Sequence, residues 1–314
     1  MPGQMKAIVC NQLSKTYKGE SKAALDGLNL EVAENSVFGF LGPNGAGKTT
    51  TIRILTSLMK ASRGEASVAG NLVRPDSNKL KMNIGYLGQE VNMYKWMKGF
   101  ELLDFTGEIF GFSKSDRYKR AKYLLELSGL NDAGNKKISS YSGGMLQRLG
   151  IAQAIMGKPK VLFLDEPTSA LDPIGRKDVL EFIKLLSDEC TVFMSTHNLA
   201  DVERVCTDVA IINHGKLVLE GSTAVLRKKF ASGKLEIDFE TETEAVKFSE
   251  VNNKILSGKI QIQGNTFSFI PENEQDQKLL VLSLLESGKY RINRLEWTNA
   301  TLEDIFIRLI EKNN

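Results

Sequence analysis

The stretch GPNGAGKTT at residues 42–50 lies between two segments of different periodicity. Before it, the run SVFGFL at residues 36–41 is short and apolar, and glycine and proline close it, which is typical of a buried strand. After it, Ile52, Leu55 and Met59 recur at helical spacing. The stretch is therefore predicted to be a glycine-rich loop that joins a strand to a helix.

The spacing of Gly42, Gly47, Lys48 and Thr49 fits the phosphate-binding loop G-x-x-x-x-G-K-[ST]. Glycines leave backbone N–H groups open to phosphate oxygens, and the following helix directs the positive end of its dipole toward them. In this pattern the lysine neutralises the β and γ oxygens of a nucleotide, and the threonine hydroxyl binds Mg²⁺. The predicted nucleotide-binding residues are Gly42, Pro43, Asn44, Gly45, Ala46, Gly47, Lys48, Thr49 and Thr50.

Two other apolar runs, at residues 161–164 and 191–194, end in polar residues and are predicted to be buried parallel strands. The first delivers Asp165 and Glu166 at its carboxyl end, where open α/β sheets place their sites. Alone, such an acidic pair usually belongs to a solvated loop. Together with a phosphate loop it predicts nucleotide hydrolysis, in which Asp165 binds Mg²⁺ and Glu166 polarises the attacking water.

The composition excludes several other function classes. The 314 residues allow about two domains of ~150 residues each. Lys+Arg 41 against Asp+Glu 38 leaves a net charge of +3, too small for a strong field toward nucleic acid or an anionic membrane. Cys10, Cys190 and Cys206 stand far apart, which excludes a disulfide scaffold. No apolar run approaches the ~18 residues of a membrane helix, so the chain is not expected to cross a bilayer.

A helical subdomain is expected within the first half of the chain. Between about residues 98 and 140, apolar residues recur at helical spacing, with Tyr118 and Leu125 on one face of a predicted helix. Gly129 is predicted to end that helix. The subdomain is placed at about residues 95–150.

The last part of the chain has a separate pattern. Strand and helix signals at residues 235–297 follow the order βαββαβ, which is that of a ferredoxin-like domain, and Thr301 is predicted to cap one more helix. We therefore expect an α/β domain with a mostly parallel sheet at residues 1–230 and a small α+β domain at residues 231–314.

The segment YSGGMLQR at residues 141–148 closely resembles the signature sequence of ATP-binding cassette (ABC) ATPases. The resemblance implies that Ser142, Gly143 and Gly144 open a helix and bind the γ-phosphate held by the opposite subunit, which agrees with anion binding at helix N-termini. Met145 replaces the glutamine commonest at that place. Because the binding atoms are a hydroxyl and backbone amides, function is expected to be retained. On its own, Ser-Gly-Gly would usually be a loop.

The same resemblance assigns four more residues. Gln89 matches the glutamine that contacts Mg²⁺ and the attacking water, and His197 matches the histidine that contacts the γ-phosphate and orients Glu166. Asp172, in SALD, matches a residue at the dimer interface, and Tyr17 matches the aromatic that stacks on adenine. The alternatives are an exposed loop glutamine, a packing histidine, and a core or surface tyrosine.

The resemblance covers about residues 5–222 and implies an ATPase that works as a head-to-tail dimer, two identical copies being simplest. Each ATP, with Mg²⁺, would lie between the phosphate loop of one copy and the signature of the other. The form YSGGM and the tail TLEDIFIRL at residues 301–309 resemble the branch that powers type-2 exporters of drugs, antimicrobial peptides, lipids or polysaccharides. We therefore expect a peripheral protein at the cytoplasmic face of the membrane, bound to separate permease subunits and not to nucleic acid.

Other interpretations remain open at this point. Soluble ABC ATPases that act on ribosomes or DNA usually carry two cassettes or long coiled coils, and this sequence has one cassette and no heptad run. The C-terminal domain could sense a small molecule, or could serve dimerisation or regulation. The stretch formed by Met93, Tyr94, Trp96, Met97 and Phe100 is a candidate for docking the permease, and ordinary core packing is its alternative.

Overall fold

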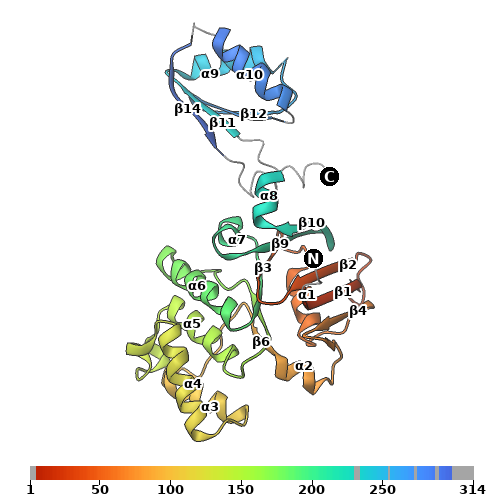
Figure 1. The fold of residues 1–314 in the computed structure, drawn as a ribbon, viewed down its shortest axis with the longest axis vertical. Helices are drawn as coiled ribbons and strands as arrows, with labels where there is room; N and C mark the ends of the chain where they lie inside the picture. The colour runs from red at the N-terminus through yellow and green to blue at the C-terminus, as the bar shows by residue number, and fades with distance from the viewer. Residues whose placement is uncertain (1–4, 230–233, 254, 272–273, 287–289, 299–314) are drawn as a thin grey trace. The chain divides into compact units, whose positions relative to one another are not determined.

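The computed structural model describes residues 5–229, 234–253, 255–271, 274–286 and 290–298 (Figure 1). By its internal contacts the chain divides into two units, Met1–Thr223 and Ala224–Asn314. Each unit has its own buried cluster of apolar side chains, and the two clusters share no residue. The chain is therefore two folds in succession.

A six-stranded sheet organises the first unit. In spatial order its strands are β10 (Lys216–Ser222), β9 (Asp208–Asn213), β3 (Val37–Leu41), β8 (Thr191–Thr196), β7 (Val161–Asp165) and β6 (Ile84–Leu87). Neighbours are parallel except β9 and β10, which form a hairpin around His214 and Gly215. Every residue of β3, β7 and β8 is buried, as expected for strands covered on both faces. The prediction of a mostly parallel sheet is confirmed.

The parallel neighbours β7 and β8 cannot be joined by a tight turn, and α6 (Pro173–Leu185) with the 3-10 helix η3 (Leu186–Asp188) connects them. Helix α7 (Leu199–Val205) leads from β8 to β9. Helix α1 (Lys48–Leu55) follows β3, and α2 (Asn78–Asn83) precedes β6.

Four phenylalanines hold the middle of the sheet together. Phe193 on β8 packs against Phe38 and Phe40 on β3 and against Phe163 on β7, with ring centroids 5.3–5.6 Å apart. All four side chains are buried, and burial of one such ring stabilises the fold by about 1.5–3 kcal/mol. These contacts fix the alignment of the three strands whose carboxyl ends carry the predicted site.

A second, antiparallel sheet packs on the same core. Its strands, in spatial order, are β2 (Leu25–Ala33), β1 (Lys6–Lys15), β4 (Arg63–Val68) and β5 (Asn71–Leu72). Leu28, Leu30 and Val32 alternate with exposed residues along β2, which is typical of a sheet with one solvated face. Their side chains share one cluster with Ile52 of α1 and Phe40 of β3, so α1 is held between the two sheets.

The expected helical subdomain is present. Its elements are α3 (Gly99–Ile109), α4 (Lys114–Leu127), η1 (Asn131–Ala133), η2 (Ile138–Ser140) and α5 (Gly143–Ala154) (Figure 1). Gly129 follows the end of α4 with φ +64°, a conformation that glycine adopts at little cost. Leu125 is buried, whereas Tyr118, predicted on the same helix face, is 46% exposed and meets the ring of Phe100 edge-on.

The second unit begins within α8 (Thr223–Lys229) and continues in the order βαββαβ. Its elements are β11 (Lys234–Phe239), α9 (Glu242–Asn252), β12 (Lys259–Gln263), β13 (Thr266–Ile270), α10 (Glu274–Glu286) and β14 (Ile292–Thr298). The strands pair antiparallel in the order β12-β13-β11-β14, so the ferredoxin-like topology is confirmed. Phe248 of α9 packs against Phe239 and Phe267 of the sheet.

Two predictions fall outside the described residues. The helix expected after Thr301 is one, and the domain boundary expected between residues 230 and 231 is the other. Within the described parts of the chain, no helix has both the length and the apolar character that crossing a membrane would require.

All three cysteines are buried in the first unit. Burial raises the pKa of Cys10 and Cys190 to about 12 and also raises the pKa of Cys206. We predict that an aromatic disulfide reagent at pH 8 modifies none of them before unfolding, because such a pKa lowers the thiolate fraction by roughly 10³-fold. Stopped-flow absorbance measures the reaction. Rapid modification of the folded chain would contradict the burial of these thiols.

Removal of residues 231–314 should leave the first unit folded, because its buried cluster contains no residue of the second unit. The three thiols then serve as the readout, since they should react no faster in the shortened chain than in the full one. Loss of their protection, together with loss of a cooperative thermal transition, would show that the first unit depends on the second.

Candidate functional site

The predicted phosphate loop connects β3 to α1 as a turn of backbone N–H groups. Gly47, the residue before α1, has φ +109°, and a Cβ there would lie 2.6 Å from the carbonyl oxygen of Ala24. A Cβ on Gly42 would lie 2.4 Å from the carbonyl oxygen of Ile212. Both positions therefore require glycine for steric reasons as well as for access to phosphate.

Lys48 is buried beneath this loop. Its ammonium donates to the carbonyl oxygens of Gly42 at 2.8 Å and Pro43 at 3.2 Å. Only 5% of the side chain is exposed, so its charge is held close to the loop rather than in solvent. With the N-terminus of α1 it supplies positive charge to the phosphate loop.

A cavity of about 460 Å³ lies beside the loop. Nine of the ten residues that line it were predicted from the sequence, Ala24 being the exception; they are Tyr17, Asn44, Gly45, Gly47, Lys48, Thr49, Thr50, Gln89 and Glu166. Tyr17 and Thr50 are linked by a hydrogen bond of 3.0 Å between their hydroxyl groups. Gly42, Pro43 and Ala46 complete the loop without lining the cavity.

Asp165 ends β7 beside the loop. The hydroxyl of Thr49 donates to its carboxylate at 3.2 Å, and the hydroxyl of Ser195, on β8, donates at 2.6 Å. Burial and the nearby Asp165 carboxylate raise the pKa of Tyr86 on β6. The end of β7 therefore gathers oxygen atoms and negative charge next to the cavity.

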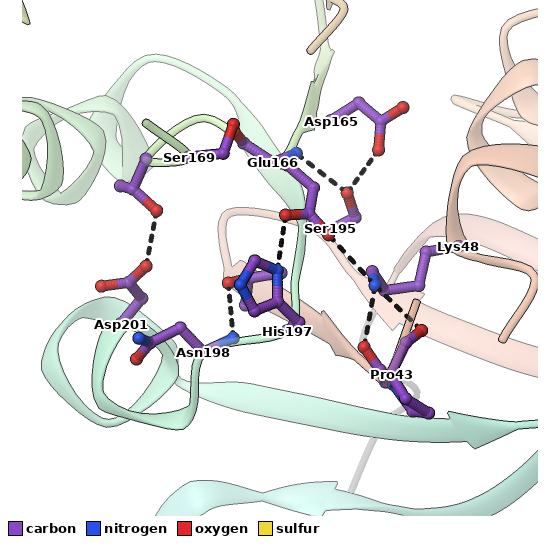
Figure 2. A network of polar contacts seen from close by, with 12 residues as sticks. Pro43, Lys48, Asp165, Glu166, Ser169, Ser195, His197, Asn198 and Asp201 are labelled. Atoms are coloured by element: carbon purple, nitrogen blue, oxygen red, sulfur yellow. Dashed lines mark hydrogen bonds and ion pairs between the residues drawn. The ribbon is translucent and has the colours of Figure 1, made fainter. Parts of the chain in front are cut away.

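Glu166 is the centre of the polar network in Figure 2. One carboxylate oxygen lies 3.1 Å from the ammonium of Lys48, and the other lies 2.6 Å from Nδ1 of His197. Its backbone N–H donates to Ser195 Oγ at 3.0 Å. The residue is 8% exposed and has φ +52°, a left-handed conformation that is uncommon outside glycine.

The signature residues lie elsewhere in the same chain. Ser142 caps α5 by accepting from the N–H of Met145 at 3.3 Å, and Asp172 caps α6 by accepting from Gly175 at 3.0 Å. The two helix ends touch, because a Cβ on Gly144 would lie 2.8 Å from Cα of Gly175. None of Ser142, Gly143, Gly144 and Asp172 lines the cavity beside the phosphate loop.

The residues of the candidate docking stretch differ in how exposed they are to solvent. Trp96 is 72% exposed and Tyr94 is 56% exposed, with ring centroids 6.0 Å apart, whereas Met97 is 9% exposed. Two of its aromatic rings are therefore available to a partner, and Met97 belongs to the core.

Several polar residues of the site were missed from the sequence. Ser195 links Asp165 to the backbone of Glu166, and its only signal was a hydroxyl near the end of an apolar strand. Thr168 and Asp201, joined by a 2.6 Å hydrogen bond, gave no recognisable motif. Their roles depend on pairing between segments distant in sequence.

Comparison with known proteins agrees with this geometry. The sequence model of the ABC transporter family matches residues 25–169. An uncharacterised ABC transporter ATP-binding protein of Bacillus subtilis, YxlF, is 34% identical over 299 residues, which cover 95% of this chain and 97% of that protein. This chain belongs to the ABC transporter family.

The family match extends to both units of the chain. The model described as "ATP-binding protein DrrA1-3-like, C-terminal domain" matches residues 221–310. The daunorubicin/doxorubicin resistance ATP-binding protein DrrA of Streptomyces peucetius is 37% identical over 313 residues, covering 97% of this chain and 92% of DrrA. The chain is thus an ATP-hydrolysing subunit of an ABC transporter, and the ribosome- or DNA-associated alternative is not supported.

The fold comparison points to the same family. The dimeric ATP-binding cassette MJ0796, solved in a post-hydrolysis state with ADP and Pi, matches with a TM-score of 0.60 and 27% identity. The match covers 68% of this chain and 98% of that cassette. The predicted ABC ATPase fold is therefore confirmed.

Replacement of Lys48 by alanine should weaken ATP binding by roughly tenfold or more, since a hydrogen bond to a charged group contributes about 1.5–3 kcal/mol. Fluorescent nucleotide titration measures the change. Lys119→Ala on α4, whose side chain lines a separate cavity, is the matched control and should bind normally. Unchanged affinity in Lys48→Ala would contradict the phosphate-loop assignment.

Proposed function

We propose that this chain hydrolyses ATP in a site shared between two copies, and that the resulting opening and closing of the pair drives export through separate membrane subunits. The observation that carries the proposal is the position of Glu166. Its carboxylate faces the cavity of the phosphate loop and is held by both Lys48 and His197.

Glu166 is proposed as the general base. A carboxylate that borders the cavity can accept a proton from water as the water attacks the γ-phosphate. His197, 2.6 Å from one carboxylate oxygen, would orient the group, and Lys48 would neutralise the β and γ oxygens. The ring of Tyr17, beside Thr50 at the same cavity, would stack on adenine.

The donor set also fits Mg²⁺. The Thr49 hydroxyl and the Asp165 carboxylate lie 3.2 Å apart, and Gln89 lines the same cavity. Hydroxyl, carboxylate and amide oxygens are ligands suited to this cation. When bound, Mg²⁺ would neutralise charge on the phosphate oxygens. Thr49, Asp165 and Gln89 are the residues that would hold it.

A second copy would complete the site. The N-terminus of α5 presents the Ser142 hydroxyl and the amides of Gly143 and Gly144, a suitable arrangement for a phosphate, yet none of them lines this chain's own cavity. Each ATP would therefore lie between the loop of one copy and α5 of the other. The dimeric relative with bound ADP and Pi supports this arrangement. Asp172, at the start of α6 beside α5, would lie at the same interface.

The transport role is proposed from the relatives. DrrA is named for resistance to daunorubicin and doxorubicin, and its similarity extends over both units of this chain. We propose export of drugs, with this chain bound to permease subunits at the cytoplasmic face of the membrane. Tyr94 and Trp96, exposed after Gln89, are the proposed contact with the permease.

Glu166→Gln tests the shared site directly. Turnover should fall by ~10²-fold or more, because the amide cannot accept the proton, while ATP stays bound and holds two copies together. Phosphate release and light scattering after size exclusion measure the two effects. Glu126→Gln, on α4, is the matched control and should hydrolyse ATP and dissociate normally.

Two results would contradict the proposal in different ways. Retained turnover in Glu166→Gln would show that another group is the base. A variant that binds ATP without turnover but stays monomeric would show that the site is not shared.

A further inference from the structure

Asp201 is a buried carboxylate that does not line the nucleotide cavity. It lies in the first turn of α7 and is 1% exposed. A charge so deeply buried is costly unless polar partners surround it. Its partners therefore indicate what it does.

The two carboxylate oxygens of Asp201 bind different segments. Oδ2 accepts from the hydroxyl of Thr168 at 2.6 Å. Oδ1 accepts from Nε of Arg176, on α6, at 2.8 Å and lies 2.7 Å from a second nitrogen of the same guanidinium. Asp201 thus joins α7 to α6 and to the segment that follows β7.

The segment at Thr168 is held in an unfavourable backbone conformation. Glu166 has φ +52° and Ala170 has φ +59°, and neither is a glycine. Such conformations persist only where surrounding contacts enforce them. The hydroxyl of Ser169 donates to the carbonyl oxygen of Glu166 at 3.0 Å, and the bond from Thr168 to Asp201 anchors the same turn from outside.

His197 and Asp201 hold this turn at two points. His197 contacts the Glu166 carboxylate (Figure 2). Asp201 contacts Thr168, which lies two residues after Glu166 in the chain. Asn198 lies between them and caps α7 by accepting from the N–H of Ala200 at 2.9 Å. The residues at the start of α7 therefore position both the Glu166 carboxylate and the turn that follows it at Thr168.

Arg176 extends the same contacts toward the proposed interface. It lies on α6, whose cap is Asp172 and whose first turn contains Gly175. Gly175 is in van der Waals range of Gly144 at the start of α5. A displacement of the N-terminal ends of α5 and α6 would therefore be transmitted to Asp201 through the Arg176 guanidinium.

We propose that Asp201 is a positioning residue that couples the ends of α5 and α6 to the geometry of Glu166 and His197. It sets the rate of hydrolysis without contacting nucleotide. The inference rests on the proposed function, because the ends of α5 and α6 are the surface assigned there to the second copy.

The test compares two substitutions of Thr168 in the full chain. Thr168→Val keeps the shape and removes the hydroxyl, and Thr168→Ser keeps the hydroxyl. We expect Thr168→Val to lower kcat about tenfold at unchanged KM for ATP, and Thr168→Ser to stay within about twofold of the parent. Thr106→Val is the control, because Thr106 is buried in α3 with its hydroxyl bonded to Leu102, and it should leave kcat unchanged.

Asp201→Asn is the second test of the same positioning role. The amide cannot accept from Thr168 and Arg176 as the carboxylate does, so kcat should fall at unchanged KM, and Thr168→Val should add nothing to it in the double variant. Additive losses would show that the two residues act separately and would overturn the inference. If Asp201→Asn does not fold, the contrast between valine and serine at position 168 decides by itself.

The remaining outcomes are distinguishable. Equal activity of the valine and serine variants, or a rise in KM instead of a fall in kcat, overturns the role of Asp201. If at the same time Glu166→Gln still binds ATP and dimerises, the proposed function stands and only this inference fails. If Glu166→Gln turns over normally, the proposed function itself fails.

Discussion

The carboxylate of Glu166 contacts Lys48 and His197 at once, and much of the first unit is arranged so that this is possible. The three residues follow the carboxyl ends of β7, β3 and β8, which are adjacent and parallel, so the segments that carry them emerge at one edge of the sheet. The packed phenylalanines of these strands hold their three carboxyl ends in alignment. A shift of β7 by a single residue would displace the carboxylate relative to both partners.

Much of this could be predicted from the sequence, because the residues involved belong to local patterns. The phosphate loop, the strand that ends in Asp165 and the strand before His197 each have a signal within about ten residues. Ser195 and Asp201 could not be assigned in this way. Their partners lie about thirty residues away along the chain, and only the folded sheet brings them together. The same limit explains why Trp96 and Met97, neighbours in one aromatic stretch, were not separated into an exposed and a buried residue.

The second unit was predictable for a different reason. An antiparallel sheet with one solvated face imposes strict alternation. Leu235 and Ile237 face the buried cluster, whereas Asp238 on the other face bonds Arg294 across the sheet. A hydrogen bond from Thr266, and then Arg294, holds the pKa of Asp238 below its usual range. The polar face is thus internally charge-paired.

The close approach of Gly144 and Gly175 has a mechanical consequence. A methyl group on Gly144 would overlap the backbone of Gly175, and one on Gly175 would overlap Asp172, the cap of its own helix. Backbone therefore meets backbone there with no side chain between them. Side chains can absorb small movements by changing rotamer, whereas two backbones in direct contact cannot. A movement of either helix start toward the other is therefore transmitted directly, because no side chain lies between them to absorb it.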